Sequence, residues 1–397
     1  MFSSIRSSRL GYLVYSLVVI ALGIGSLVFF WFMVTGFNVG VYSENTLVGS
    51  VYVGGLTEEE ALEKVNNRVN NWLANSTVQF DTGYQGYYYE FDRDLLVFDV
   101  QRSISQMRDG SANPLVVSYR GDNRNFVKEQ IEDAEFLRNL DSALDIDRVI
   151  DDMLADAAAM KTFSRKELHN YFIDYESQLT VLSESNYLIP ESVSSQTAFH
   201  DKLIEVYPEG EIEFEPYQIY SVLDALGETL SSNELNVIGG ALLEAITPTH
   251  MIILERHYNP QIDLSRYPDV EEFPYYGINA RVNQYVDYDF SFENNSNLTY
   301  TIKFYAPQNY RMKFELIGLP YLNQITLLSD DPNQPYNEIE INYDTEFTNV
   351  EAHAQDGQNG RIITVKREIR DIYDDILSNQ EIVFEFYPPV KEIKYQP

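Results

Sequence analysis

The strongest feature of the hydrophobic pattern is an uncharged apolar run at residues 10–34. As an α-helix this run would extend about 37 Å at ~1.5 Å per residue, which exceeds the ~30 Å hydrocarbon core of a bilayer. The pattern therefore predicts a transmembrane helix. The alternative is a cleaved signal peptide, but the run is longer than the usual ~7–15 apolar residues of such a peptide. The best cleavage sequence after it, Val34-Thr35-Gly36, is a poor one.

Basic residues near this run predict its orientation. Arg6 and Arg9 precede it, whereas the next basic residue is Lys64. Because positively charged flanks remain in the cytoplasm, residues 1–9 are expected there and everything after the helix outside the cell. The predicted location is therefore the cell membrane, crossed once.

Helical periodicity returns after the membrane segment. Thr57-x-x-Glu60 has the form of a capping box, and apolar residues follow at helical spacing as far as Trp72. The simplest interpretation places this stripe, with Trp72, against a core. The functional alternative is that Trp72 forms a platform on which a sugar ring stacks.

A strand-like segment at residues 77–100 contains the aromatic run Tyr87-Tyr88-Tyr89. Successive side chains of a strand point to opposite faces, so Tyr88 is expected to face away from its two neighbours. Packing across a hairpin is the default role of such rings. Contact of Tyr87 and Tyr89 with a polysaccharide is the functional alternative.

The rest of the chain alternates between short helices and strands. A helix is predicted to begin after Asp141 or Ser142, and two short helices are predicted within residues 216–246. From Met251 onward the pattern is that of strands, and residues 281–307 are expected to form a hairpin that turns at the sequence ENNSN. The fold class predicted is α+β, ending in a small antiparallel β module.

Composition narrows the function of the 397-residue chain. It carries 61 acidic and 28 basic residues, a net charge of -33, so a nucleic-acid partner is not expected. The same negative field repels anionic lipids and anionic wall polymers. The chain contains no cysteine, which excludes disulfides, thiolate metal sites and cysteine nucleophiles.

No catalytic, phosphate-binding or metal-binding motif is found, and no cofactor is expected. His250 and His257 flank a predicted strand that also contains Glu255. In an extended segment Glu255 and His257 share a face while His250 points the other way, so a metal site is not predicted there. Paired carboxylates could hydrolyse a glycosidic bond, but so acidic a chain offers chance pairs everywhere.

Several stretches, in order along the chain, resemble one family architecture. The sequence VGSVYVGGLTEEEALEKV, residues 48–65, resembles the opening of the peptidoglycan-binding-like domain of YoaR-type and VanW-family proteins. Its matching positions are Gly54 and Gly55 at the turn and Thr57 at the helix cap. The sequence LLEAITPTHMIILERHYNP resembles the end of a VanW domain, with matching positions Glu255, Arg256 and His257.

The later stretches extend the resemblance. Residues 286–305 resemble the strand pair that closes a VanW domain, and residues 357–369 and 386–395 resemble a small β-domain, named for its glycines, that often follows it. A VanW domain normally carries a Gly-rich, Cys-containing segment before its final helix, whereas this chain has only Gly239 and Gly240 there. The resemblance therefore implies a divergent, non-catalytic relative.

The resemblance implies a non-enzymatic protein of a Gram-positive cell envelope that binds peptidoglycan or an envelope partner. The alternatives are a carboxylate-dependent cell-wall hydrolase and a partner-binding subunit of a membrane complex. The domains expected along the chain are a cytoplasmic tail (1–9), a transmembrane helix (10–34), a peptidoglycan-binding-like α+β domain (37–160), a divergent VanW-like domain (161–305) and a C-terminal β module (306–397).

Overall fold

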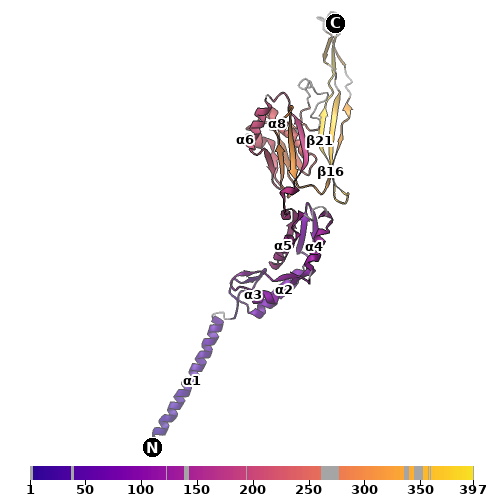
Figure 1. Ribbon diagram of the computed structural model, residues 1–397. Coiled ribbons are helices and arrows are strands. Elements are labelled where there is room, and N and C mark those ends of the chain that lie inside the picture. The colour runs from indigo at the N-terminus through magenta and orange to yellow at the C-terminus, as the bar shows by residue number, and fades with distance from the viewer. Residues whose placement is uncertain are drawn as a thin grey trace. The chain divides into compact units, whose positions relative to one another are not determined.

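The chain forms two compact units, Met1–Ile173 and Asp174–Pro397, each with its own buried core. Figure 1 shows the computed structural model, coloured along the chain. The residues that the structure describes are 3–36, 40–121, 123–137, 143–193, 195–260, 277–334, 339–343, 352–355, 357 and 359–396.

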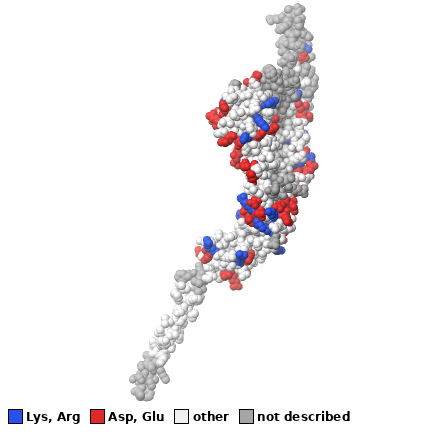
Figure 2. Space-filling model, in the orientation of Figure 1, with Lys and Arg blue, Asp and Glu red and all other residues white. Residues whose placement is uncertain are grey.

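The chain begins with one long helix, α1 (Ser3–Gly36). Its segment Gly11–Met33 is long and apolar enough to cross a membrane, and none of it is buried by the rest of the protein. Figure 2 shows no basic or acidic side chain along this segment, whereas acidic side chains are spread over the folded units. The predicted apolar helix is confirmed, and it is consistent with a signal anchor or with a signal peptide.

After α1, the described residues of the first unit form helices and three small sheets. The strand orders are β2-β1-β6, β4-β3-β8 and β5-β7. The elements are β1 (Leu47–Val48), β2 (Val51–Tyr52), α2 (Glu58–Ala74), β3 (Gln79–Tyr84), β4 (Tyr87–Glu90), β5 (Leu96–Phe98), α3 (Val100–Gln106), β6 (Ala112–Asn113), β7 (Val117–Tyr119), α4 (Asn123–Glu132), α5 (Ile146–Ala158) and β8 (Phe163–Glu167).

Helix starts follow the local signals of the sequence. The backbone N–H of Thr57 donates to Glu60 Oε2 at 2.9 Å and the N–H of Glu60 donates to Thr57 Oγ1 at 3.4 Å, which is the predicted capping box of α2. Helix α5 instead begins after Asp145, whose carboxylate accepts from the N–H of Arg148 at 3.0 Å. The predicted cap positions, residues 141–142, lie outside the described residues.

The second unit begins with two sheets and three helices among its described residues. The strand orders are β10-β14-β15-β9 and β11-β13-β12, and α8 packs on β9 and β15. The two helices predicted within residues 216–246 are α7 and α8. The elements are β9 (Thr180–Leu188), α6 (Gln196–Val206), β10 (Glu211–Phe214), β11 (Ile219–Ser221), α7 (Val222–Leu226), α8 (Ser232–Ile246), β12 (Ile252–Arg256), β13 (Phe290–Glu293), β14 (Tyr300–Phe304) and β15 (Arg311–Gly318).

The predicted hairpin between β13 and β14 is wrong in its pairing. Both strands form, but β13 pairs with β11 and β12, whereas β14 pairs with β10 and β15. Their connection crosses from one sheet to the other, and the buried side chain of Asn294 holds it against the end of β10. The Asn294 amide donates to the carbonyl oxygens of Phe214 at 3.2 Å, Glu215 at 3.0 Å and Leu298 at 2.7 Å.

The C-terminal strands form the predicted antiparallel sheet, in which β20 lies between β16 and β21 (Figure 1). A second small sheet has the order β18-β22-β19, and its β18–β22 pair is parallel, which the prediction did not include. The strands are β16 (Gln324–Asp330), β17 (Asn333–Gln334), β18 (Ile339–Tyr343), β19 (Ala352–Gln355), β20 (Gly360–Arg370), β21 (Ile376–Tyr387) and β22 (Glu392–Gln396).

Two of the predicted domain boundaries fall between strands that pair. Strand β8 follows the predicted boundary at residue 160, yet it pairs in parallel with β3 and belongs to the first unit, which ends at Ile173. Strand β15 follows the predicted boundary at residue 305, yet it pairs with β14 and β9 of the middle sheet. The boundaries predicted at residues 160 and 305 therefore each separate strands that pair with one another, because alternation marks a strand without identifying its partner.

Candidate functional site

The glycine pair of α8 lies where the VanW resemblance expects a Gly-rich segment. A Cβ on Gly240 would lie 2.1 Å from the hydroxyl oxygen of Tyr187, and a Cβ on Gly239 would lie 3.0 Å from Cγ2 of Val282. Both glycines are buried. They allow the helix to approach the sheet closely, so their role in this structure is packing.

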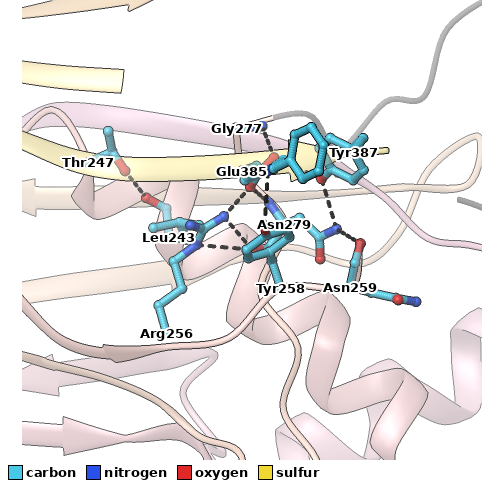
Figure 3. A network of polar contacts seen from close by, with 10 residues as sticks. Leu243, Thr247, Arg256, Tyr258, Asn259, Gly277, Asn279, Glu385 and Tyr387 are labelled. Carbon is cyan, nitrogen blue, oxygen red and sulfur yellow. Dashed lines mark hydrogen bonds and ion pairs between the residues drawn. The ribbon is translucent and has the colours of Figure 1, made fainter. Parts of the chain in front are cut away.

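A buried charge pair joins the middle sheets of the second unit to the C-terminal sheet. Arg256, the last residue of β12, donates to Glu385 of β21, and their side chains are 8% and 0% exposed (Figure 3). The Arg256 guanidinium also donates to the carbonyl oxygen of Asn279 at 3.1 and 2.7 Å. Arg256 and Glu385 lie 129 residues apart in the chain, so their pair holds two parts of the unit together.

Further donors complete the environment of Glu385. Its two carboxylate oxygens accept from the N–H of Gly277 at 2.8 Å, the N–H of Asn279 at 3.3 Å and the hydroxyl of Tyr387 at 2.8 Å. The Asn279 side chain also donates to the Tyr387 oxygen at 3.1 Å. Burial raises the pKa of Glu385 above its ordinary value, while Arg256 and the hydrogen-bond donors act in the opposite direction.

A second buried charge from the same sheet lies at the end of α8. Arg367 of β20 is 4% exposed, and its guanidinium donates to the carbonyl oxygens of Thr249 at 2.6 Å and Met251 at 2.9 Å. These carbonyls follow the C-terminus of α8, where the helix dipole favours a cation. We call Arg256, Asn279, Glu385, Tyr387 and Arg367 the junction, because together they attach the C-terminal sheet to the middle of the unit.

The neighbours of Arg256 in the predicted motif lie partly exposed. Glu255 Oε1 and His257 Nε2 are 2.9 Å apart, and Glu255 also accepts from the N–H of Asp289 at 3.1 Å. The His257 ring stacks on Tyr288 with centroids 4.1 Å apart. The predicted shared face of Glu255 and His257 is therefore confirmed.

His250 lies apart from that pair. Its ring packs edge-on against Tyr321, with centroids 4.5 Å apart. Burial, with a smaller contribution from Arg367, lowers the pKa of His250 to about 4, so the side chain is neutral at pH 7. Within the part of the chain that the structure describes, no group of three His, Asp or Glu residues is placed to hold a metal.

In the first unit, Trp72 occupies the core. It is 1% exposed, its indole N–H donates to the Lys161 carbonyl oxygen at 2.8 Å, and its ring packs edge-on against Phe80 and Phe98. This placement matches the core interpretation of its sequence position. It leaves no ring face on which a sugar could stack.

The aromatic run of β4 divides between two faces as expected. Tyr87 and Tyr89 are half-buried, and Tyr87 stacks on Phe136 with centroids 6.2 Å apart. Tyr88 points the other way and is 47% exposed. The ring most open to solvent is therefore Tyr88 and not the two rings that the polysaccharide hypothesis chose.

The predicted family-motif positions of the first unit shape the turn before α2. A Cβ on Gly54 would lie 2.6 Å from the hydroxyl oxygen of Tyr52, and Gly55 has a φ of +76°, in the left-handed region that favours glycine. Together with Thr57 at the cap, they act on local backbone geometry, and nothing in their surroundings indicates a ligand.

Sequence reasoning missed most of the junction. Asn279 lies 23 residues beyond Arg256 and Glu385 lies 129 residues beyond it, and no spacing rule connects these positions or those of Tyr387 and Arg367. One signal was present, since Glu385 alternates with Val383 and Tyr387, which are 1% and 2% exposed. An acidic residue on the inward face of a strand needs a buried partner.

Comparisons with known proteins add little. No family model matches the chain. No curated protein matches it either. A solved structure titled "Crystal structure of HP0197-G5" aligns with a TM-score of 0.14 and 13% sequence identity, covering 19% of this chain and 97% of that chain. This partial similarity to a G5 domain is too low to assign a fold or a function.

Proposed function

We propose that this chain is a membrane-anchored, extracytoplasmic envelope protein that binds peptidoglycan and catalyses no reaction. The observation that carries the proposal is α1, whose segment Gly11–Met33 is apolar and has no part buried by the folded units. A fully exposed apolar helix of this length would be costly in water, and a bilayer supplies the surroundings it requires.

The distribution of basic residues supports an outward orientation. Arg6 and Arg9 lie before the apolar segment, and no basic residue follows until Lys64. This asymmetry favours a cytoplasmic start and an exterior location for both units.

The surroundings of Glu385 support a structural role for this carboxylate rather than a hydrolytic one. Both oxygens of Glu385 are occupied by Arg256, by backbone N–H groups and by Tyr387, and the side chain is 0% exposed. A hydrolytic carboxylate must reach both substrate and water. The buried Arg256–Glu385 pair therefore acts as an attachment between parts of the second unit.

The net charge of -33 restricts the kind of wall component that the exterior can contact. Anionic wall polymers are repelled unless cations screen the interaction, whereas the uncharged sugars of peptidoglycan are not. The ligand proposed is accordingly the peptidoglycan itself, rather than the anionic polymers attached to it.

Sedimentation with purified cell walls tests this function. The full chain in detergent micelles should co-sediment with sacculi stripped of anionic polymers, and with unstripped sacculi only when salt or Mg²⁺ is raised. If the protein stays in the supernatant throughout, wall binding is refuted, and cross-linking in cells then examines the partner-binding alternative. A new muropeptide detected by mass spectrometry would refute the non-enzymatic part.

A further inference from the structure

The sheet β4-β3-β8 of the first unit has one face turned to the core and one turned outward. On the core side, Phe80 and Thr82 of β3 are 1% and 0% exposed. On the other side the strand register aligns Asp81 with Glu90 and Arg165, and Gly83 with Tyr88. We call this second side the outer face, and the residues on which its chemistry depends are Asp81, Gly83, Tyr88, Glu90, Phe163 and Arg165.

The ring of Tyr88 is held in place on the outer face. A Cβ on Gly83 would lie 2.5 Å from the Cδ1 and Cε1 atoms of Tyr88, so the ring lies directly over this glycine. Arg165 Cζ is 3.7 Å from the ring centroid. Arg165 is itself fixed, because its Nε and Nη2 each donate to Asp81 at 2.9 Å. Tyr88 therefore loses little further side-chain freedom when a ligand binds.

A second exposed ring lies near the same guanidinium. Phe163 is 55% exposed, and Arg165 Cζ is 5.6 Å from its ring centroid. The outer face thus presents two aromatic rings beside one arginine whose charge is balanced by Asp81. Packing in the core does not explain why these two positions are aromatic, because each ring remains about half open to solvent.

The chemistry of the outer face selects an uncharged ligand. The paired Arg165 offers no free positive charge for an anion, and the negative field of the chain repels polyanions. Aromatic rings provide flat apolar surfaces that suit the C–H faces of pyranose rings. The exposed carboxylate of Glu90, on the same face as Tyr88, can accept hydrogen bonds from sugar hydroxyls.

We propose that the outer face binds a neutral glycan strand, with sugar rings stacked on Tyr88 and Phe163. The proposal rests on the proposed function and deepens it, since it assigns peptidoglycan binding to one surface and to the sugar part of the polymer. It replaces Tyr87 and Tyr89 with Tyr88 as the contacting ring, because the strand turns Tyr88 outward.

Calorimetric titration of the full chain in micelles with a chitooligosaccharide, an uncharged N-acetylglucosamine oligomer, tests the proposal. Tyr88→Ala is expected to weaken binding about tenfold, because a stacked aromatic contact contributes roughly that factor. Tyr88→Phe keeps the ring and should bind like the unmodified chain. Tyr285→Ala removes a tyrosine that is 82% exposed in the second unit and should also leave binding unchanged.

The outcomes separate this proposal from the wider function. Sedimentation with sacculi but no binding of the oligosaccharide, or equal binding by Tyr88→Ala, overturns the outer face as a glycan site and leaves the proposed function intact. If the unmodified chain does not sediment with sacculi, both the outer face as a glycan site and the proposed function are overturned. If Tyr88→Ala abolishes self-association in ultracentrifugation and leaves sugar binding unchanged, the face is a contact between copies. If Tyr88→Ala alters the circular dichroism spectrum, the variant Phe163→Ala tests the proposal instead. It should also bind the oligosaccharide about tenfold more weakly than the unmodified chain.

Discussion

Replacing Arg256 with alanine is expected to destabilise the second unit by about 3–5 kcal/mol, the cost typical of leaving one partner of a buried ion pair alone. Glu385 would remain in a site where its side chain is 0% exposed, without the cation that offsets its burial. The carbonyl oxygen of Asn279 would also lose the guanidinium that donates to it.

Hydrogen exchange of strands β20 and β21, followed by mass spectrometry, measures this loss. Tryptophan fluorescence would not report it, because both tryptophans, Trp31 and Trp72, lie in the first unit. Lys303→Ala is the matched control, since it breaks a solvent-exposed pair with Glu211 in the same unit and should change exchange little. Unaltered exchange of both strands in Arg256→Ala would show that the junction does not attach the sheet.

The pH dependence of the same variant follows from the direction of the Glu385 pKa shift. Burial already raises this pKa, and removing Arg256 removes a group that lowers it, so the pKa rises further. A raised carboxyl pKa in the folded state stabilises the fold below the unfolded pKa, and that contribution is lost as pH rises through the folded pKa. The difference in unfolding free energy between Arg256→Ala and the unmodified chain should therefore be largest at neutral pH and become smaller in acid.

Replacing Trp72 with alanine is expected to destabilise the first unit by about 3–5 kcal/mol, as for other large core residues. The change removes a 1% exposed side chain and its edge-on contacts with Phe80 and Phe98. The carbonyl oxygen of Lys161 also loses the indole N–H that donates to it. Trp72→Phe should lower the unfolding free energy by less than Trp72→Ala does, because phenylalanine keeps most of the ring volume.

Urea denaturation followed by circular dichroism measures the effect on the first unit. Phe126→Ala is the control, since this ring is 47% exposed and its removal should shift the midpoint little. A Trp72→Ala variant with unchanged stability and lost sugar binding would restore the platform interpretation that the structure disfavours.

Local signals predicted local structure well. The capping box at Thr57, the buried stripe ending at Trp72 and the opposite facing of Tyr88 and its neighbours all depend on residues a few positions apart. Side-chain periodicity and end capping determine these features within one element, so a single sequence contains the information.

Pairing between distant segments was not predictable in the same way. The hairpin of β13 and β14 was wrong because alternation predicts two strands without identifying the sheet that each one joins. The junction was missed because Arg256 and Glu385 meet only after the C-terminal sheet has packed on the unit. The outer face likewise needed the register of β8 with β3 before Arg165 could be placed beside Tyr88.

Cysteine labelling in intact cells tests the central claim, a retained anchor with both folded units outside. The chain has no cysteine, so each introduced one is reported alone. A membrane-impermeant maleimide should label Ser105→Cys and Ser177→Cys, one in each unit, in intact cells. The maleimide should label Ser4→Cys only after the cells are permeabilised. The labelled chain should remain in the membrane fraction. Labelling of Ser4→Cys in intact cells with protection of the other two, or release of the folded units without α1, would contradict the account.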